Sequence, residues 1–545
     1  MSEKISLDSS ELLIFIKMKK TFSLFLAFAL GVVVPQTFAA DYYVSPTGDD
    51  KAAGTSAETA LKTIQAAIEK LEDNTPTTIH LEENATFDVY GPEAIIIGAK
   101  KNVVLRGKNT TLKSGDQPFL GDRVITIGTN TDATISGLIL KNGCTRDGIP
   151  GGAIFFEGNE LIVDSCTFIN NEANNSGGAI ASCGKNVTIT NCVFDENRIF
   201  GGYGGAAIIY HCGLPNNAEE PGALIIRNTA FTNNISKADA KGDIIGFHYA
   251  YRGSEYTPLY SNVNYFELTN CVFKDNEPGV SPSVRPAASD IYINNVREDF
   301  EMNLINNTFY KTKAVAIPFF YETPYRIINN IFYNDKDFTI MSSNVCGERD
   351  PLIAYNNVFV GGLGENMDDP ALNAEKEKYG NVVLDAVELN KLGLTPRLQD
   401  DNYVPYLPIT DESSILINKG LSSTSGMEGF DKELIPATDI RGLATVDGKD
   451  IGSFEYGSTS GIAGITADKQ ASFVIYRNGD EAIVRNLTDQ TLNLSIVLLD
   501  GRTIYNAALK DELTINKSEL EIPNGVLIFT VNNGNRFESQ KVILF

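Results

Sequence analysis

The sequence predicts an all-β solenoid, and two regularities support this prediction. An asparagine stands three residues before a phenylalanine in six segments of the chain, and an apolar residue stands two residues before each asparagine. These segments recur at intervals of 23 to 42 residues, and intervals of this size are typical of stacked repeats. The six asparagines are Asn191, Asn228, Asn270, Asn306, Asn329 and Asn356.

Each repeat has the pattern of two short strands joined by a bend. The flanking residues are β-branched or aromatic and alternate with polar ones, which favours strands over helices. Asparagine enters the left-handed backbone region at low cost, and two earlier copies carry Ser165 and Gly137 at the same position. Equivalent residues of stacked coils lie about 4.8 Å apart. We therefore predict a structural asparagine ladder at the bend and a column of phenylalanines inside.

This repeat resembles that of the pectin-lyase-like family, whose fold is a right-handed parallel β-helix with an asparagine ladder at such a bend. The resemblance implies that residues 41–456 form the β-helix. Apolar residues from Leu61 to Leu71 fall at helical spacing, and this segment is similar to the helix that caps the first coil in secreted members. The alternative is an ordinary β-sandwich that happens to be rich in asparagine.

A second motif runs through the coils from Gly151 onward. Gly-Gly-Ala-Ile occurs at 151–154 and 177–180, and an asparagine follows the anchor phenylalanine or its equivalent after three residues. The pair of signals is similar to the repeat of chlamydial polymorphic outer-membrane proteins, which are surface adhesins. We interpret it as structural, because the glycines permit tight turns. The asparagines are Asn171, Asn197, Asn234 and Asn276.

The end of the predicted solenoid has its own signature. Asp439-Ile-Arg-Gly442 is followed by Asp450-Ile-Gly-Ser-Phe-Glu-Tyr456. This succession resembles the closing part of the choice-of-anchor Q domain, which is found on bacterial β-helix proteins with various surface anchors. We expect Asp439 and Arg441 to form a structural ion pair with Asp450 or Glu455.

Both ends of the chain carry features of export. Residues 1–40 contain Lys19 and Lys20, an apolar run over 22–34 and small residues at 37–40, which is the order of a signal peptide. Translation from Met18 fits this signal better than translation from Met1. We expect the mature chain to begin near Asp41.

The C-terminal part reads as a linker over 457–470 and a small β-sandwich over 471–545. Strands in the latter are broken by Asp500-Gly501 and Asn524-Gly525. It resembles the C-terminal sorting domain of the type IX secretion system of Bacteroidetes, although the Asn-Pro that is usual near the start of that domain is missing here. The resemblance implies the type IX secretion machinery as a partner and a cell-surface or extracellular location.

Charge and composition argue against several partners. The formal net charge is −24, so nucleic acid and anionic lipid are poor partners, and polyuronates would be repelled unless calcium bridged the carboxylates. No segment after the leader is long enough to span a membrane. Cys166, Cys192 and Cys271 share a face with the anchor phenylalanines and read as buried core residues. The spacing of the cysteines predicts no metal site, and no cofactor is expected.

Candidate binding residues lie in two aromatic loop regions of the middle coils. Loops on a rigid scaffold often carry function, and tyrosines can stack on sugar rings. A loop that merely packs on the scaffold is the alternative interpretation. The candidates are Arg198, Tyr203, His211, His248, Tyr249, Tyr251, Arg252 and Tyr256.

Three functions remain open at this point. We favour an adhesin-like scaffold that contacts a polysaccharide, a surface glycan or another surface through its loops. A polysaccharide lyase or glycoside hydrolase is the second reading, and only a lyase would call for calcium. However, no repeat strand carries the paired carboxylates of a hydrolase at a recurring position. The third reading is a structural stalk without a specific ligand.

Overall fold

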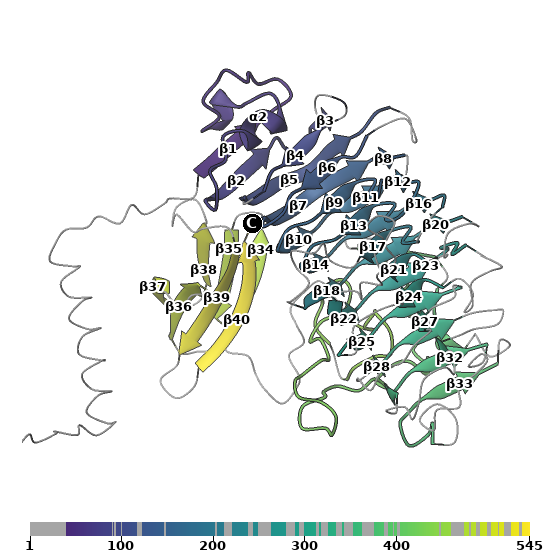
Figure 1. The fold of residues 1–545 in the computed structure, drawn as a ribbon. Helices are drawn as coiled ribbons and strands as arrows, with labels where there is room; N and C mark the ends of the chain where they lie inside the picture. Colours follow the sequence, from purple (N-terminus) through teal and green to yellow (C-terminus); the bar gives the residue numbers. More distant parts are fainter. Residues whose placement is uncertain are drawn as a thin grey trace, which may run out of the picture.

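A computed structural model describes most of residues 40–544 and shows a long solenoid of parallel strands followed by a small antiparallel domain (Figure 1). The residues within this range that are not described are 90, 92–93, 100, 117–121, 147–148, 202–203, 212–220, 238–242, 249–262, 280–288, 294–298, 312–314, 318–324, 334–339, 343–351, 362–374, 386–390, 396, 400–403, 446–447, 459–472, 479–480, 487–490, 499–502, 511, 517–524 and 533–536.

Sheet A is the longest sheet and holds the two strands on either side of each predicted bend. Every pairing within it is parallel and joins equivalent residues of neighbouring coils, as for Phe168 with Phe194. In the described part of the chain its strands are β1 (Ala40–Val44), β2 (Pro76–Leu81), β3 (Thr86–Asp88), β5 (Asn102–Lys113), β7 (Asp132–Lys141), β10 (Glu160–Asp164), β11 (Thr167–Ile169), β14 (Asn186–Thr190), β15 (Val193–Asp195), β18 (Gly222–Arg227), β19 (Ala230–Thr232), β22 (Val263–Thr269), β23 (Val272–Lys274), β25 (Glu301–Ile305), β26 (Thr308–Tyr310), β28 (Tyr325–Ile328), β29 (Ile331–Tyr333), β31 (Ile353–Tyr355), β32 (Val358–Val360) and β33 (Val382–Leu384).

Two further parallel sheets complete the coils. Sheet B comprises β4 (Ile95–Ile97), β6 (Ile125–Ile127), β9 (Ile154–Phe156), β13 (Ile180–Ser182), β17 (Ile208–His211), β21 (Ile245–His248), β24 (Ile291–Ile293), β27 (Val315–Ile317) and β30 (Ile340–Ser342). Sheet C comprises the short strands β8 (Cys144–Thr145), β12 (Glu172–Ala173), β16 (Arg198–Ile199) and β20 (Ile235–Ser236). This stacking of coils is a parallel β-helix.

The C-terminal domain consists of two antiparallel sheets. One contains β34 (Phe473–Asn478), β35 (Glu481–Asn486) and β38 (Glu512–Asn516), and the other contains β36 (Leu492–Leu498), β37 (Thr503–Leu509), β39 (Gly525–Asn532) and β40 (Phe537–Leu544). The predicted fold class, a parallel β-helix followed by a small β-sandwich, is confirmed.

The capping helix is shorter than the apolar spacing predicts. Helix α2 covers Ile64–Ile68, and the side chain of Thr63 accepts a hydrogen bond from the backbone of Ala66 at its start. Leu61 lies outside the helix because it forms a bridge with Val44 of β1. The buried face of the helix still packs on the first coils, where its Gln65 side chain accepts a hydrogen bond from the backbone of Ile96.

The bend of each coil has the conformation that its asparagine favours. The six asparagines of the predicted ladder have φ between 49° and 57°, and Ser165 and Gly137 also have positive φ. Their side chains are linked from coil to coil, as in Asn228 to Asn191 at 3.2 Å and Asn329 to Asn306 at 3.0 Å. The anchor phenylalanines stack inside, with ring centroids 4.6 to 5.2 Å apart.

A second, inner ladder adjoins the first and is fully buried. The Asn330 side-chain oxygen accepts hydrogen bonds from both nitrogens of Asn307, and its amide donates to Asn357 and to the backbone of Leu304 at 2.8 to 3.0 Å. Asn357 is bonded in the same way to Asn381. Cysteines occupy this position in earlier coils, and Cys166, Cys192 and Cys271 are buried and free.

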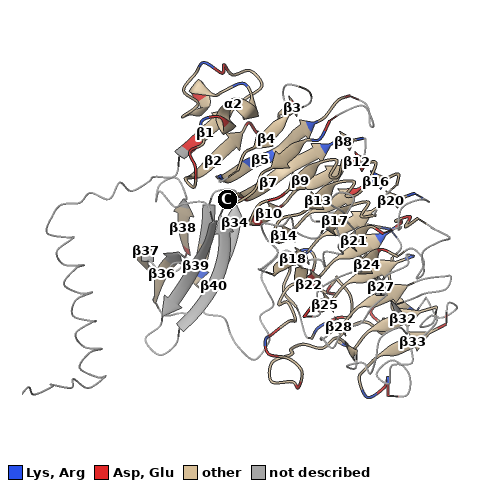
Figure 2. Ribbon diagram, in the orientation of Figure 1, with Lys and Arg blue, Asp and Glu red and all other residues tan. Residues whose placement is uncertain are grey.

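The asparagines that follow the anchors form a third ladder. Asn171, Asn197 and Asn234 each donate to the side-chain oxygen of the next coil at 3.0 Å and are completely buried. A polar side chain can occupy the core of the coil because each of its hydrogen-bonding groups finds a partner one coil away. Charged residues lie mainly at strand ends and in loops, as Figure 2 shows.

We predict that Asn330→Ala destabilises the β-helix by roughly 2 to 4 kcal/mol, because it removes several buried hydrogen bonds and leaves donors of Asn307 unpaired. Urea or thermal unfolding measures this loss. Asn102→Ala, at a half-buried position whose side chain has no hydrogen bond to the described residues, is the control and should change stability little. Equal midpoints for Asn330→Ala and the control would contradict the role of the inner ladder.

Candidate functional site

The segment after the last coil folds back along the outside of the solenoid. We call residues 419–457 the closing strap. Ladder asparagines hold it: Asn356 donates to the backbone oxygen of Lys419 at 2.5 Å, Asn329 to that of Leu421 at 2.9 Å, and Asn270 to that of Thr438 at 2.8 Å. The outer asparagine ladder is therefore both the bend of the coils and the attachment line of the strap.

Apolar packing covers the same region. Outward-facing residues of the later coils, such as Ile331 and Val358, are buried against Leu416, Ile451 and Phe454. On the other side of the bend, Ile435 packs on Ile305 and Ile328. The sequence indicates which coils the strap covers. In β29 and β32 both residues that flank the anchor phenylalanine are large and apolar, whereas in β15, in an earlier coil, one of the two is the charged Asp195.

Buried charges fix the end of the strap. Arg441 donates two hydrogen bonds to Asp439, at 2.7 and 2.5 Å, and its guanidinium lies 4.0 Å from the ring centre of Phe454. Lys449 forms an ion pair with Glu455 at 2.6 Å. The expected pairing with Asp450 or Glu455 is therefore wrong in detail, since Arg441 pairs with Asp439 and contacts only the backbone of Glu455.

Burial shifts the pKa values of two of these carboxyls upward. Burial raises the pKa of Glu455 to about 7, although the neighbouring Lys449 opposes this shift. Burial also raises the pKa of Asp450, while backbone hydrogen bonds from Asn418 and Tyr456 oppose it. Because the folded-state pKa of Glu455 exceeds its ordinary value of 4.5, this group favours the docked strap below about pH 4.5. That contribution is lost as the pH rises through 7.

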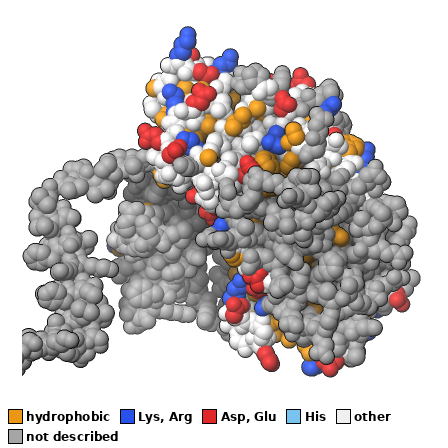
Figure 3. Space-filling model, in the orientation of Figure 1, with side chains coloured by type: hydrophobic (Ala, Val, Ile, Leu, Met, Phe, Trp, Pro, Cys, Tyr) orange, Lys and Arg blue, Asp and Glu red, His pale blue; other side chains and the backbone are white. Residues whose placement is uncertain are grey.

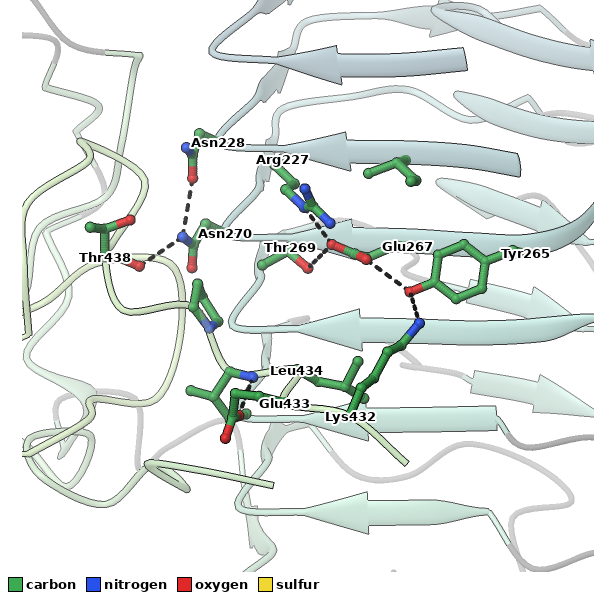
Figure 4. A pocket seen from close by; sticks show the side chains of 13 residues that line it. Arg227, Asn228, Tyr265, Glu267, Thr269, Asn270, Lys432, Glu433, Leu434 and Thr438 are labelled. Carbon is green, nitrogen blue, oxygen red and sulfur yellow. Dashed lines mark hydrogen bonds and ion pairs between the residues drawn. The ribbon is translucent and has the colours of Figure 1, made fainter. Parts of the chain in front are cut away.

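A pocket of about 450 Å³ lies between the strap and the outer face of sheet A (Figure 4). We call it the strap pocket. Strands β18 and β22 form one wall with outward-facing side chains, and strap residues 432–438 form the other. Its residues are Ile225, Arg227, Asn228, Tyr265, Glu267, Thr269, Asn270, Lys432, Glu433, Leu434, Ile435, Pro436 and Thr438.

A chain of four polar side chains crosses the pocket floor. Arg227 Nε donates to Glu267 Oε1 at 2.5 Å, and the hydroxyl of Tyr265 donates to Glu267 Oε2 at 2.9 Å. Lys432 Nζ donates to the Tyr265 hydroxyl at 3.2 Å and lies 4.4 Å from the centre of its ring. The network thus joins two solenoid strands to the strap.

The carboxylates of this pocket are held in their ionised form. Burial alone would raise the pKa of Glu267, but the hydrogen bond and charge of Arg227 and the hydroxyls of Tyr265 and Thr269 lower it overall. Glu433 accepts hydrogen bonds from Ser423 and from the backbone of Thr424 and Ile435. These bonds outweigh burial and lower the pKa of Glu433 to about 2.

The residues predicted from the aromatic loops are only partly described. Arg198 lies on β16, half-buried and in register with Glu172 of β12. His211 and His248 are backbone neighbours on β17 and β21, and their side chains are outside the described set. The remaining candidates, all outside the described residues, are Tyr203, Tyr249, Tyr251, Arg252 and Tyr256.

Glu172 is the titratable group that the structure places beside Arg198. Its side chain is buried, and burial raises its pKa to about 7 against the lowering effect of Arg198, Arg146 and Lys237. Sequence reasoning did not single out this group. It also missed the strap pocket, whose signal is the polar alternation Tyr265, Glu267, Thr269 along one strand.

The described part of the chain holds neither a cluster of metal-binding side chains nor a membrane-spanning helix. No group of three or more His, Cys, Asp or Glu side chains is placed there to hold a metal ion. Among the same residues, no helix has the length and apolar character needed to cross a membrane. On the face shown in Figure 3, charged side chains of both signs are interspersed with hydrophobic ones over the N-terminal coils.

Comparisons with known proteins give a likeness in structure but none in sequence. No protein-family model matches the sequence, and no curated protein matches it. Among solved structures, the chain is similar to the GH136 lacto-N-biosidase of Eubacterium ramulus, with a TM-score of 0.30 and 12% sequence identity. The match covers 59% of this chain and 64% of the biosidase chain, slightly less than two thirds of the latter.

We predict that above pH 7, where Glu455 is ionised, Lys449→Met weakens strap docking by roughly 3 to 5 kcal/mol, because Glu455 is then buried without its counter-ion. Lys449→Met combined with Glu455→Gln should recover much of the loss. Hydrogen exchange of residues 419–457 measures docking directly. Lys378→Met, which breaks an exposed ion pair with Glu375, should have little effect. Unchanged exchange in Lys449→Met would show that the buried pair does not hold the strap.

Proposed function

We propose that this chain is an exported, cell-surface β-helix that binds a glycan through the strap pocket. The observation that carries the proposal is the set of hydrogen-bonding side chains that Arg227, Asn228, Tyr265 and Lys432 present at one pocket. Its volume of about 450 Å³ is within the range of small-molecule sites, roughly 300 to 1,000 Å³. Sugars suit such a site because their ring and hydroxyl oxygens accept hydrogen bonds.

The chemistry of the pocket favours binding over hydrolysis. A glycosidase needs one carboxyl that stays protonated near neutral pH to act as the general acid, and so a raised pKa. The pKa values of Glu267 and Glu433 are both lowered. Each carboxylate is moreover occupied by protein donors, Glu267 by Arg227 and Tyr265 and Glu433 by the backbone of its own loop.

The scaffold supports recognition by holding the solenoid wall of the pocket rigid. Tyr265 and Glu267 are on β22, which pairs in register with β18 and β25 on either side. Lys432 covers one face of the Tyr265 ring, so that face is not free to stack on a sugar ring. We therefore expect the pocket to recognise the sugar through hydrogen bonds to its oxygens. The opposite wall is held by Asn270, which donates to Thr438.

Export and attachment form the second part of the proposal. Support comes from the signal-like residues 1–40, from the likeness of residues 413–456 to a choice-of-anchor Q end, and from the tail. The sequence of residues 471–545 resembles that of a type IX sorting domain, and the described strands of this segment are antiparallel and have a buried core, which includes Leu494 and Ile496. We therefore assign surface attachment to the tail and ligand contact to the solenoid.

We expect the purified chain to bind at least one member of a panel of neutral and acidic oligosaccharides. Arg227→Gln should weaken that binding about tenfold, because hydrogen bonds to a charged group are lost. Arg106→Gln on β5 is the matched control. Binding is measured by calorimetry, together with reducing ends and unsaturated products. Binding that is equal in both variants would remove the strap pocket as the site, and turnover would favour the enzyme reading.

A second expectation concerns the tail. Deleting residues 471–545 should leave the β-helix folded, because its core and strap are complete without the tail, but should prevent surface display. Whole-cell protease accessibility and fractionation measure display, and circular dichroism checks the fold. Equal display with and without the tail would contradict the sorting assignment.

A further inference from the structure

The strap pocket holds more hydrogen-bond donors than free acceptors. Both oxygens of Glu267 already accept bonds, one from Arg227 and one from Tyr265. Both oxygens of Glu433 accept bonds from residues 423–435. The side-chain oxygen of Asn228 accepts from Asn270 at 3.1 Å. The acceptors on the pocket walls are thus largely used by the protein itself.

The donors, in contrast, are only partly used. A guanidinium carries five N–H groups and an ammonium carries three. Arg227 bonds to Glu267 through Nε, and within the described residues its two Nη atoms have no recorded partner. Lys432 Nζ donates to the Tyr265 hydroxyl, and no carboxylate among the residues described lies within ion-pair distance of it. The side chain of Arg227 is 46% exposed, and Arg227 lines the pocket.

These two cations belong to different walls. Arg227 is on β18 of the solenoid, whereas Lys432 is on the strap. Figure 4 shows them approaching the Glu267–Tyr265 pair from opposite sides. A ligand that reaches both cations would therefore contact the solenoid and the strap at once.

We propose that the strap pocket takes an acidic sugar, a glycan unit bearing a carboxylate or sulfate, whose anionic group is bound by Arg227 and Lys432 and so clamps the strap onto the solenoid. This inference rests on the proposed glycan-binding function and names its ligand class. A guanidinium fork matches the two oxygens of such a group. A neutral sugar would offer acceptors but no charge to pair with Arg227 and Lys432.

The net charge of −24 does not prevent this binding. Charges farther than about 8 Å are screened at physiological salt, so the contacts within the pocket decide.

Clamping follows from linkage. A ligand that contacts both walls binds only when the strap is docked, so it shifts the docking equilibrium by its own binding free energy. Attachment of the strap and occupancy of the pocket are then coupled reciprocally. Protection of the strap from hydrogen exchange therefore reports ligand binding independently of a measured affinity.

The first test compares 3′-sialyllactose, sulfated lactose and lactose on the full chain by calorimetry. We expect the two acidic sugars to bind at least about tenfold more tightly than lactose, the value of one charge-assisted hydrogen bond. Lys432→Met should lower acidic-sugar binding by a similar factor and lactose binding by less, because lactose loses one neutral hydrogen bond and no ion pair. Lys432→Arg should retain acidic-sugar binding. Lys378→Met is a matched control, since Lys378 lies 4.9 Å from the centre of the Tyr379 ring.

The second test is hydrogen exchange of residues 419–457 with and without 3′-sialyllactose. Protection of the strap should increase in wild-type protein and in Lys378→Met, and should not increase in Lys432→Met. Because Lys432 is exposed, its replacement leaves the fold intact, and thermal unfolding verifies this.

The results of these tests distinguish an acidic ligand and a clamped strap from glycan binding in general. If lactose binds as tightly as the acidic sugars and Arg227→Gln weakens that binding, the pocket is a glycan site but the preference for acidic sugars is wrong. If free sulfate or acetate binds as tightly as the acidic sugars, the pocket recognises an anion alone and the proposal of a sugar ligand is wrong. Binding of no oligosaccharide would overturn both, and acidic-sugar binding without added strap protection would overturn the clamp.

Discussion

The structure depends on the in-register stacking of one coil on the next. Because the pairing is parallel and residue-matched, each side chain meets its own equivalent about 4.8 Å away. This repetition turns an amide, which is costly to bury alone, into a self-satisfying column. Asn330 illustrates the principle, since its oxygen and nitrogen are both bonded to the equivalent residues of the two neighbouring coils. The anchor phenylalanines likewise contact their equivalents in neighbouring coils, as stacked rings.

The outer ladder differs from the inner one because it lies at a convex bend and has bonding capacity to spare. In the later coils this capacity is used by the strap, whose backbone oxygens accept from Asn270, Asn329 and Asn356. The strap is therefore attached without forming a strand of the sheet. Apolar contacts and buried ion pairs complete its docking, and the space between its residues 432–438 and sheet A is the strap pocket.

The strap pocket therefore joins two kinds of structure with different stability. The solenoid wall is fixed by strand pairing on both sides, while the strap wall is fixed by single contacts, a few apolar residues and charges whose pKa values are shifted by burial. Local opening is expected where regular hydrogen bonding is sparse. A ligand that touches both walls acts at the boundary between these regions, where its binding energy has the largest effect on motion.

The sequence by itself determined the repeat, the strand–bend–strand unit and the stacking of the anchors, because these depend on local backbone preference and periodicity. It also located the left-handed bends, since asparagine and glycine mark them. It overestimated helix α2, because the bridge between Leu61 and Val44 is a contact between separate segments. It did not show a coil at Val382–Leu384, where Asn381 continues the inner ladder without an anchor phenylalanine.

The tertiary structure alone decided where the strap lies and therefore which residues form a site. Arg227, Tyr265 and Glu267 are outward-facing residues of ordinary strands, and Lys432 is separated from Tyr265 by 167 positions in the chain. No local pattern brings such residues together. The same reason explains the ion-pair partners: Arg441 could be recognised as structural from its motif, but its pairing with Asp439 rather than Glu455 follows from the turn that the folded strap adopts. Repetition is encoded locally and can be read from sequence, whereas a single non-repeating contact depends on where the folded chain returns.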